Sequence, residues 1–285
     1  MLQESNLYYI GGVVRDGILG VPSFDTDYCY EGNAIEFAKN QGLNIIKENP
    51  AFGTVRVLYE GKEIDIASTR CETYPRKGHL PQVEKIGCPL AEDVKRRDFT
   101  INAIAKRTTD GEIIDFTGGV KDIEAKKLRV LHDKSFIDDP TRIVRGLKFA
   151  VRFGFELDEK TKELQEEYLC NINYDMSYHR LKKELVETFS LNRQEALDRF
   201  ITQGIYKLLS PDCKSVEIHT NIESLIEENP VNTVWIVYMG LFNLENLELT
   251  RAEKKILDWA ERLKQGDKPN NNTPKESILL NKIRG

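Results

Sequence analysis

The segment GGVVRDGILGVPSFDTD, from Gly11 to Asp27, restricts the fold and the chemistry more than any other part of the sequence. The glycine pair, Gly11 and Gly12, predicts a turn whose backbone N–H groups come close to a phosphate, and Arg15 is suited to bind that phosphate. Side chains alternate along a strand, so Asp25 and Asp27 are expected on one face, where they repel each other unless a cation lies between them. Mg²⁺ is the expected cation, because carboxylate oxygens are its usual protein ligands. The order of these residues predicts phosphoryl or nucleotidyl transfer.

Each part of this pattern also has a purely structural interpretation. A glycine pair alone is usually a turn, and two aspartates at this spacing often lie at the solvated end of a strand. The ordered combination, with an Arg-Asp dipeptide between the two parts, favours the functional interpretation.

A third carboxylate follows in the sequence Glu63-Ile64-Asp65-Ile66. Its alternation of acidic and apolar residues predicts a strand, and Asp65 is the candidate third metal ligand or the base for an attacking hydroxyl. Alternatively, Asp65 is an ordinary exposed strand residue, and Glu63 on the same face could replace it.

Local signals predict an α+β chain, with a small mixed or antiparallel sheet and helices in an N-terminal head and only helices after it. Strands are expected at 7–10, 24–30 and 112–115, with a hairpin of 54–59 and 63–68. Helices are expected at 15–19, 34–40, 91–106, 138–153, 160–168, 177–189, 194–203 and 251–264, and the segment 75–90 has the composition of a loop. We expect domains at 1–115, 116–175 and 176–265, followed by a polar, mobile C-terminal tail at 266–285.

Composition limits the class of protein. The 285 residues are 40% hydrophobic and 31% charged, which suits about two domains or one large domain with an appendage. Neither a secretion signal nor an apolar run of about 18 residues is present, so we expect neither secretion nor a membrane span. The five scattered cysteines suit the reducing cytoplasm and argue against a structural zinc site.

The net charge of −5 argues only mildly against a nucleic-acid partner, because a local basic strip can bind phosphates on an acidic protein. One candidate strip is KRRDFTINA, whose three consecutive cations suit a triphosphate or, alternatively, form a solvated turn. The other is DDPTRIVRGLKFAVRFGF, where Asp139 could cap a helix that begins with Pro140. Arg142 and Arg145 then follow one side of that helix, facing either a cleft or solvent.

At this point the chain resembles bacterial-type, class II tRNA nucleotidyltransferases and the related poly(A) polymerases. The matching segments are GGVVRDGILG with DTD, FGTVRV, EIDIASTRCETY, RRDFTINA, DDPTRIVRGLKFAVRFGF and SYHRLKKEL, which occur in the family's order from Tyr9 to about Leu185. The segments YEGNAIEFAK and ETYPRKGHLP resemble the A-adding or CC-adding branch. The resemblance implies a catalytic head at 1–115, a base-selecting neck at 116–175 and a tRNA-binding body with a reduced tail at 176–265.

The resemblance also implies roles for single residues. Asp25 and Asp27 match the family's Mg²⁺ ligands. Gly12, Arg15 and Arg97 match its triphosphate contacts, and Asn102 of RRDFTINA and Arg145 match further nucleotide contacts. Asp139 and Arg142 match the pair that reads the base of CTP or ATP. The chain departs from the family pattern at Asp138, Lys148 and His179.

The implied function is template-independent addition of C and/or A from CTP and ATP to the 3′ end of tRNA, with release of pyrophosphate. The expected cofactor is Mg²⁺, the expected location is the cytoplasm, and the enzyme acts alone or alongside a separate partner nucleotidyltransferase. The alternatives are poly(A) addition to RNA 3′ ends and an RNA-binding relative that has lost catalysis.

Overall fold

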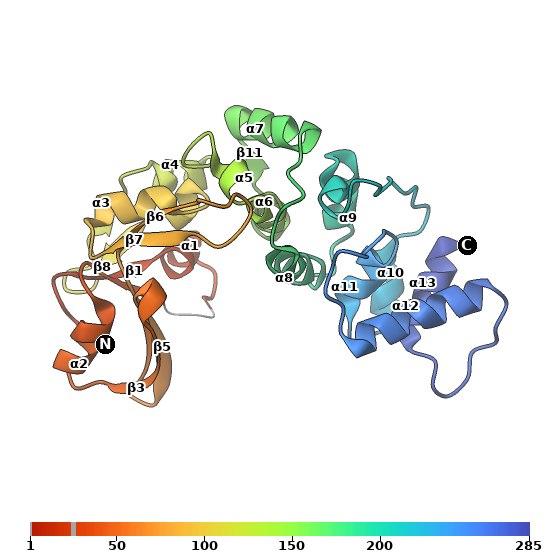
Figure 1. The fold of residues 1–285 in the computed structure, drawn as a ribbon, viewed down its shortest axis with the longest axis horizontal. Helices are drawn as coiled ribbons and strands as arrows, with labels where there is room; N and C mark the ends of the chain where they lie inside the picture. Colours follow the sequence, from red (N-terminus) through yellow and green to blue (C-terminus); the bar gives the residue numbers. More distant parts are fainter. Residues whose placement is uncertain (1, 24–26) are drawn as a thin grey trace. The chain divides into compact units, whose positions relative to one another are not determined.

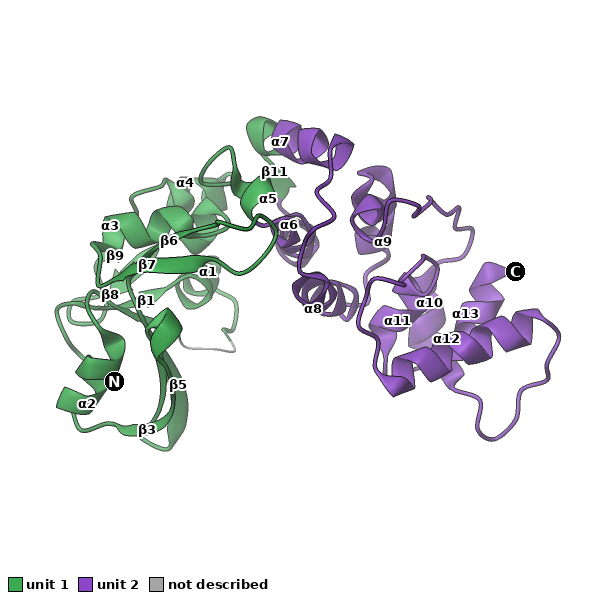
Figure 2. Ribbon diagram, viewed as in Figure 1, with its two compact units in different colours: residues 1–138, 156–161 green, residues 139–155, 162–285 purple. Residues whose placement is uncertain are grey.

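The computed structural model describes residues 2–23 and 27–285 (Figure 1). The chain folds into two compact units (Figure 2). The first contains Met1–Asp138 and Glu156–Thr161, and the second contains Asp139–Phe155 and Lys162–Gly285. The first unit therefore extends beyond residue 115, the end expected for the head.

A seven-stranded sheet forms the centre of the first unit. Its strands in spatial order are β3 (Asn44–Asn49), β4 (Thr54–Tyr59), β5 (Lys62–Ser68), β2 (Asp27–Tyr30), β1 (Leu7–Ile10), β8 (Ala105–Arg107) and β9 (Ile113–Ile114). Only β2 and β5 are parallel, and every other neighbouring pair is antiparallel. The α+β fold and the mixed sheet predicted from the sequence are confirmed.

Alternation along the strands gives the sheet two different faces. On one face, Leu7, Tyr28 and Ile66 pack against α2 (Ala34–Asn40). On the other face, Tyr8, Ile10 and Cys29 pack with Leu90 of α3 (Leu90–Asp93) and with Val94. Asp27 lies two residues before Cys29 on the same strand, so its side chain belongs to this second face.

Several shorter elements complete the first unit. They are α1 (Gly12–Leu19), α4 (Gly119–Glu124), α5 (Ser135–Asp138), the antiparallel pair β6 (Arg70–Thr73) and β7 (Gln82–Ile86), and the parallel pair β10 (Lys127–Leu128) and β11 (Glu156–Leu157). Strand β11 comes after a long helix of the second unit, so the chain returns to the first unit to complete it.

Two sequence predictions for the first unit are wrong. The helix expected at 91–106 is instead α3, the 3₁₀ helices Val94–Arg96 and Thr100–Asn102, and strand β8. The helix is interrupted because the Asp98 carboxylate accepts a hydrogen bond from the Phe99 amide, 2.8 Å away, and Phe99 is extended. The expected loop at 75–90 contains β7, which pairs with the distant strand β6.

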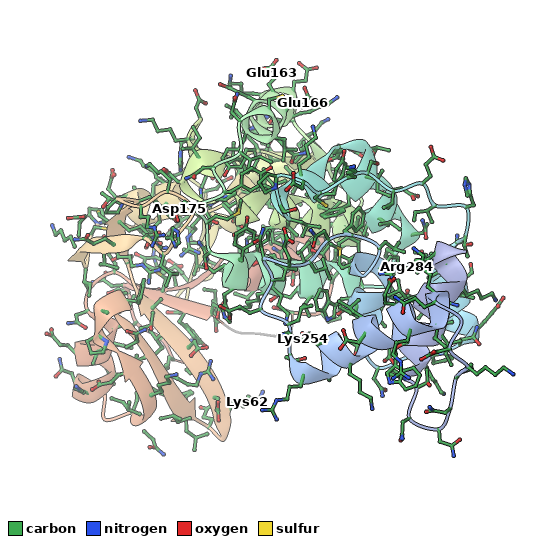
Figure 3. All side chains as sticks on the ribbon, turned by 45° about the vertical axis from the view of Figure 1, so that its right-hand side comes forward. Lys62, Glu163, Glu166, Asp175, Lys254 and Arg284 are labelled. Atoms are coloured by element: carbon green, nitrogen blue, oxygen red, sulfur yellow. The ribbon has the colours of Figure 1, made fainter. Side chains whose placement is uncertain are left out.

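The second unit is helical, as expected. Its helices are α6 (Thr141–Phe153), α7 (Glu159–Cys170), α8 (Tyr178–Phe189), α9 (Gln194–Thr202), α10 (Ile222–Glu228), α11 (Val234–Met239), α12 (Arg251–Lys264) and α13 (Lys275–Arg284), and α7 begins in the first unit. Aromatic side chains fill much of its core, with the rings of Phe189 and Phe200 edge to face at 5.4 Å. Glu163 and Glu166 point outward from α7 (Figure 3).

The prediction of a mobile tail at 266–285 is wrong for its second half. Helix α13 occupies Lys275–Arg284 and buries Leu279 and Leu280. The polar composition of 266–274 concealed this short helix, whose apolar residues are few but adjacent. No helix among the described residues is long and apolar enough to cross a membrane.

Candidate functional site

The glycine turn of the first unit positions Arg15. Gly11 precedes α1 with φ 71° and ψ −123°, a conformation that residues with a Cβ atom avoid. Helix α1 begins immediately afterwards, so Arg15 falls in its first turn and is 4% exposed. Its Nε and Nη2 donate hydrogen bonds to Oδ1 of Asp16, over 2.9 and 2.7 Å.

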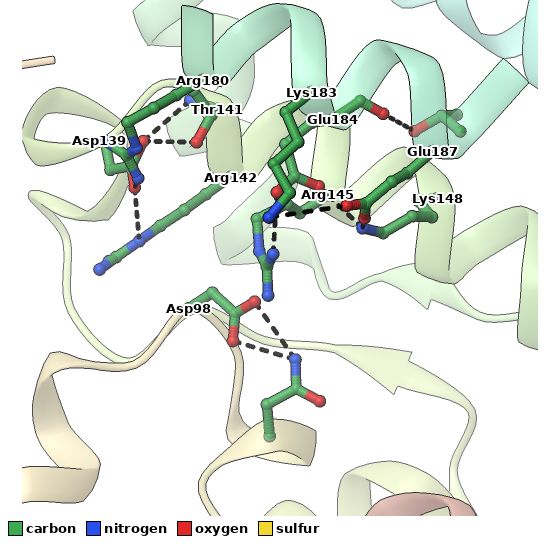
Figure 4. A network of polar contacts seen from close by, with 12 residues as sticks. Asp98, Asp139, Thr141, Arg142, Arg145, Lys148, Arg180, Lys183, Glu184 and Glu187 are labelled. Carbon is green, nitrogen blue, oxygen red and sulfur yellow. Dashed lines mark hydrogen bonds and ion pairs between the residues drawn. The ribbon is translucent and has the colours of Figure 1, made fainter. Parts of the chain in front are cut away.

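Asn102 connects this arginine to the segment RRDFTINA. Nη1 of Arg15 donates to Oδ1 of Asn102. Nδ2 of Asn102 donates to both carboxylate oxygens of Asp98, which is labelled in Figure 4, over 3.0 and 3.2 Å. All of these side chains are buried. The two motifs that the sequence analysis assigned to nucleotide binding thus form one network of hydrogen bonds.

Arg97 lies beside the glycine turn. A Cβ atom at Gly11 would lie 3.5 Å from Nη1 of Arg97. Nη2 of Arg97 donates to Oδ2 of Asp93 over 2.9 Å. Within the described residues, Nε of Arg97 is buried and has no hydrogen-bond partner. A buried N–H donor without an acceptor is costly, so this atom suits an anionic ligand such as a phosphate.

Asp93 holds the basic segment in place. Its fully buried carboxylate accepts hydrogen bonds from the Arg70 amide and from the side chains of Arg96 and Arg97. Burial acts to raise the pKa of Asp93, but the charges of Arg97 and Arg96 and the Arg70 amide outweigh it and hold the pKa below its usual value.

The candidate metal ligands lie on the second face of the sheet. Asp27 of β2 is directly opposite Asp65 of β5, and both are exposed. The Asp65 carboxylate also accepts two hydrogen bonds from Arg56 of β4, over 2.8 and 2.7 Å. Asp25, the other predicted ligand, lies outside the described residues. Among the described residues, no group of three acidic, histidine or cysteine side chains could hold a metal ion.

The donor set nevertheless fits a divalent cation. Two carboxylates on adjacent strand positions supply the oxygen ligands that Mg²⁺ prefers. Asp25, two residues before Asp27 in the sequence, is the candidate for a third carboxylate.

In the second unit, Asp139 is held from both sides of its carboxylate (Figure 4). Its Oδ1 accepts hydrogen bonds from the Thr141 amide and hydroxyl over 3.2 and 2.6 Å, at the first residue of α6. The N-cap residue is Pro140 and not Asp139, so the helix begins one residue later than expected. Oδ2 of Asp139 accepts a hydrogen bond from Nη2 of Arg180 and lies 4.0 Å from Nε of Arg142. A carboxylate has about four lone-pair positions, so these hydrogen bonds do not exhaust it.

Further along α6, two cations share one carboxylate of α8. Arg145 and Lys148 donate to the two oxygens of Glu184 over 2.9 and 2.8 Å, and Lys148 also bonds to Glu187 (Figure 4). Burial acts to raise the pKa of Glu187, but Lys148 holds it below its usual value. Arg142, Arg145 and Lys148 of α6 and the preceding Asp139 are therefore all held by polar contacts.

Comparison with known proteins explains why these motifs occur together. Residues 7–129 match the Poly A polymerase head domain. The A-adding tRNA nucleotidyltransferase of Aquifex aeolicus is 41% identical over 259 residues, 88% of this chain and 28% of that protein. A CCA-adding enzyme in its apo form II superposes with a TM-score of 0.81 at 26% identity, over 98% of this chain and 75% of the other. The Thermotoga maritima CCA-adding enzyme complexed with tRNA gives a TM-score of 0.71 at 26% identity, with coverages of 96% and 73%.

The chain belongs to the tRNA nucleotidyltransferase and poly(A) polymerase family. It spans about 28% of the length of the Aquifex relative. The surroundings of Asp138, Lys148 and His179 accommodate these three departures from the family pattern. Lys148 keeps two carboxylate partners, Asp138 accepts a hydrogen bond from Lys77 over 2.6 Å, and the side chain of His179 is 78% exposed.

Sequence reasoning missed the acidic partners that hold the arginines of this family member. Asp16 and Asp98 were quoted only as parts of motifs, and Asp93 was not singled out. A sequence signal existed for Asp16, which directly follows Arg15 in GGVVRDG. In KRRDF, by contrast, the Asp98 carboxylate binds Asn102, and Arg97 pairs with Asp93. A buried arginine needs a nearby anion, and the next residue is the simplest source.

Proposed function

We propose that this chain transfers a nucleotide from ATP or CTP to the 3′ end of tRNA and releases pyrophosphate. The observation that carries the proposal is the network joining Arg15, Asn102 and Asp98, with the unpartnered Nε of Arg97 beside the same turn. It gathers donors for a triphosphate in the unit that also bears the paired aspartates.

Each site residue then has a proposed role. Gly11 and Gly12 let the turn approach the phosphates, and Arg15, Arg97 and Asn102 bind or orient them. Asp25 and Asp27 hold Mg²⁺, with Asp65 as a third ligand or as the base that accepts the proton of the attacking 3′-hydroxyl. A bound Mg²⁺ would stabilise the negative charge that develops on the leaving pyrophosphate.

Base choice is proposed for Asp139 and Arg142, with Arg145 as a further contact. Cytosine and adenine each present an exocyclic amine donor beside a ring-nitrogen acceptor. A carboxylate and a guanidinium complement that pattern, whereas uracil and guanine present it reversed. Arg142 and Asp139 are 3% and 4% exposed, so a mismatched base would leave buried polar groups unpaired.

Addition of A is the favoured activity. The Aquifex relative, which matches 88% of this chain, is A-adding, and the segments YEGNAIEFAK and ETYPRKGHLP resemble the same branch. Such an enzyme implies a separate partner that adds CC. We place the reaction in the cytoplasm, where the five cysteines, free thiols in the structure, would stay reduced.

The decisive experiment is incorporation of labelled ATP and CTP, separately and together, into tRNAs ending before CCA, after C and after CC. ATP added only to the CC-ending tRNA is the expected result. Growth of the first tRNA by three nucleotides would make this a CCA-adding enzyme, and a long ladder would make it a poly(A) polymerase.

Variants connect that activity to the site. Asp27→Ala is expected to abolish incorporation while the protein stays folded, because a metal ligand is lost. Asp133→Ala removes an exposed aspartate of the same unit and should leave incorporation unchanged. Binding of tRNA without incorporation by the unmodified protein, at any Mg²⁺ concentration, would instead favour the inactive RNA-binding alternative.

A further inference from the structure

The first unit contains a cavity that the proposed reaction does not use. Its volume is about 840 Å³, within the range of about 300–1,000 Å³ typical of small-molecule sites. It lies between α1 and the sheet face that carries Tyr9, Tyr28 and Ile64. Ile64 alternates with Asp65 on β5, so this face is opposite the one that bears Asp27 and Asp65.

Gly17 opens the cavity on its helical side. It lines the cavity in the middle of α1, where a side chain would normally pack against the sheet. A Cβ atom added there would meet nothing within 4 Å. The apolar side chains of Ile18 and Ile113 also line the cavity and are 37% and 43% exposed. The cavity is therefore open to solvent and bordered by apolar surface.

The floor is aromatic. Tyr9 and Tyr28 are opposite each other on β1 and β2, with ring centroids 4.8 Å apart and hydroxyl oxygens 3.4 Å apart. Tyr59 at the end of β4 adds a third ring to the lining. Tyrosine rings bind flat heterocycles by stacking, and their hydroxyl groups add polar contacts.

The charge at the cavity is positive. Lys62 at the start of β5 (Figure 3) and Lys106 of β8 both line it, with β2 and β1 between their strands. Neither lysine makes an ion pair with any residue that the structure describes. Arg107 is already paired with Asp110 and Glu112, and Glu60 is the one carboxylate among the described lining residues.

We propose that this cavity binds a flat aromatic anion of about nucleotide size. The ring would lie against the tyrosines beside Gly17, and the anionic group would face Lys106 or Lys62. The same chemistry could come from a free mononucleotide or from a nucleotide within RNA. The proposal does not rest on the transfer reaction, because its residues lie on the other face of the sheet.

The test uses the full chain and anilinonaphthalene sulfonate, an aromatic anion whose fluorescence rises in apolar sites. Gly17→Leu fills the cavity and should raise the Kd of the probe about tenfold or more. Of Lys106→Gln and Lys62→Gln, the variant at the lysine that faces the anionic group should raise the Kd about threefold, as expected for the loss of an exposed charge partner, and the other should change it less. Lys121→Gln, an exposed lysine of the same unit outside the cavity, should leave it unchanged.

Competition then identifies the source of the ligand. AMP should displace the probe better than adenosine, which lacks the phosphate. If a 5′-phosphorylated oligoadenylate competes better than AMP, the natural ligand is a nucleotide within RNA. An unchanged Kd in Gly17→Leu would overturn the proposal, because the probe would then be bound elsewhere, including at the candidate triphosphate site. Sensitivity to Gly17→Leu without any effect of the lysines, or displacement by neither AMP nor the oligoadenylate, would also overturn it. Circular dichroism of each variant checks that it is folded.

Discussion

The buried charge of Asp93 explains how the basic segment Lys95–Arg97 of the first unit is held in one conformation. Three donors converge on Asp93, and two of them are the side chains of Arg96 and Arg97. Without the carboxylate, Arg97 would lose its anionic partner, and Arg96 would keep Glu72, whose carboxylate is 3.4 Å away. Arg97 would then no longer be held beside Gly11, so the candidate triphosphate site depends on a residue that is not expected to touch the nucleotide.

Asp93→Asn is expected to lower the free energy of unfolding at pH 7 by about 3 kcal/mol, since it breaks a buried ion pair. The folded-state pKa of Asp93 is lowered, so its stabilising contribution is complete above the ordinary aspartate pKa, about 3.9, and is lost as the pH falls further. Urea denaturation at pH 7, 5 and 3.5 should show the same difference between the wild type and the variant at pH 7 and 5, and a slightly smaller difference at pH 3.5.

Asp110→Asn is the matched control for that measurement. Asp110 also has a lowered pKa, caused by the Glu112 amide and Arg107, but it is exposed. Its replacement should hardly change the denaturation midpoint. Equal effects of the two substitutions would show that burial of Asp93 does not matter.

Among the helices and strands, the sequence correctly predicted those that are stabilised by contacts between residues close together in the chain. Helix α2 occupies the predicted range 34–40, because Asn33 accepts hydrogen bonds from the Ile35 and Glu36 amides at its start. The hairpin of β4 and β5 was predicted from alternation and its Glu-Gly turn. The structure of the region 91–106 was not predicted correctly, because its conformation depends on distant partners. One is Arg129, whose carbonyl accepts a hydrogen bond from the Thr100 amide.

Helix α12 offers a direct test of a local signal. Thr250 accepts a hydrogen bond from the Glu253 amide, and Glu253 accepts one from the Thr250 amide, which forms a capping box. Thr250→Ala should lower the free energy of unfolding by about 1 kcal/mol. Thr233 precedes α11 without a side-chain capping hydrogen bond, so Thr233→Ala should cost clearly less. Thermal unfolding of both variants tests this prediction. Equal decreases in Tm would argue against a stabilising role of the capping box.

The packing of α6 against α8 depends on charge as well as on apolar contact. Glu184→Gln removes the shared partner of Arg145 and Lys148 and should cost about 2 kcal/mol. In a double-mutant cycle with Lys148→Met, the two losses should couple by about 1 kcal/mol or more.

Lys183 provides the control for that cycle. Its ammonium is 4.0 Å from Glu187 and forms no ion pair with Glu184, so Lys183→Met should couple with Glu184→Gln much less than Lys148→Met does. If the stability losses of Lys148→Met and Glu184→Gln were simply additive, this result would contradict the proposal that the Glu184 carboxylate binds Lys148.

For the whole molecule, sequence reasoning found the order of the parts but not the path of the chain between them. The sheet unit and the helical unit could be predicted, because periodicity indicates them. The contact between Arg15 and Asn102 was not predicted, although the resemblance assigned both residues to nucleotide binding. The return of 156–161 to the first unit could not, because it depends on single long-range contacts. Asp158 accepts from Arg129 over 2.7 Å, and the Thr161 hydroxyl accepts the Val130 amide over 3.0 Å.

Thr161→Val should therefore destabilise the first unit, although most of α7, the helix that contains Thr161, belongs to the second unit. The substitution keeps the side-chain volume but leaves the buried Val130 amide without its acceptor, at a cost of about 1–3 kcal/mol. Hydrogen exchange of the Val130 amide should speed up about tenfold or more, since about 1.4 kcal/mol corresponds to tenfold. Thr188→Val is the control, because the Thr188 hydroxyl only donates to the Glu184 carbonyl within α8. Faster exchange confined to α7 would mean that 156–161 does not hold the first unit together.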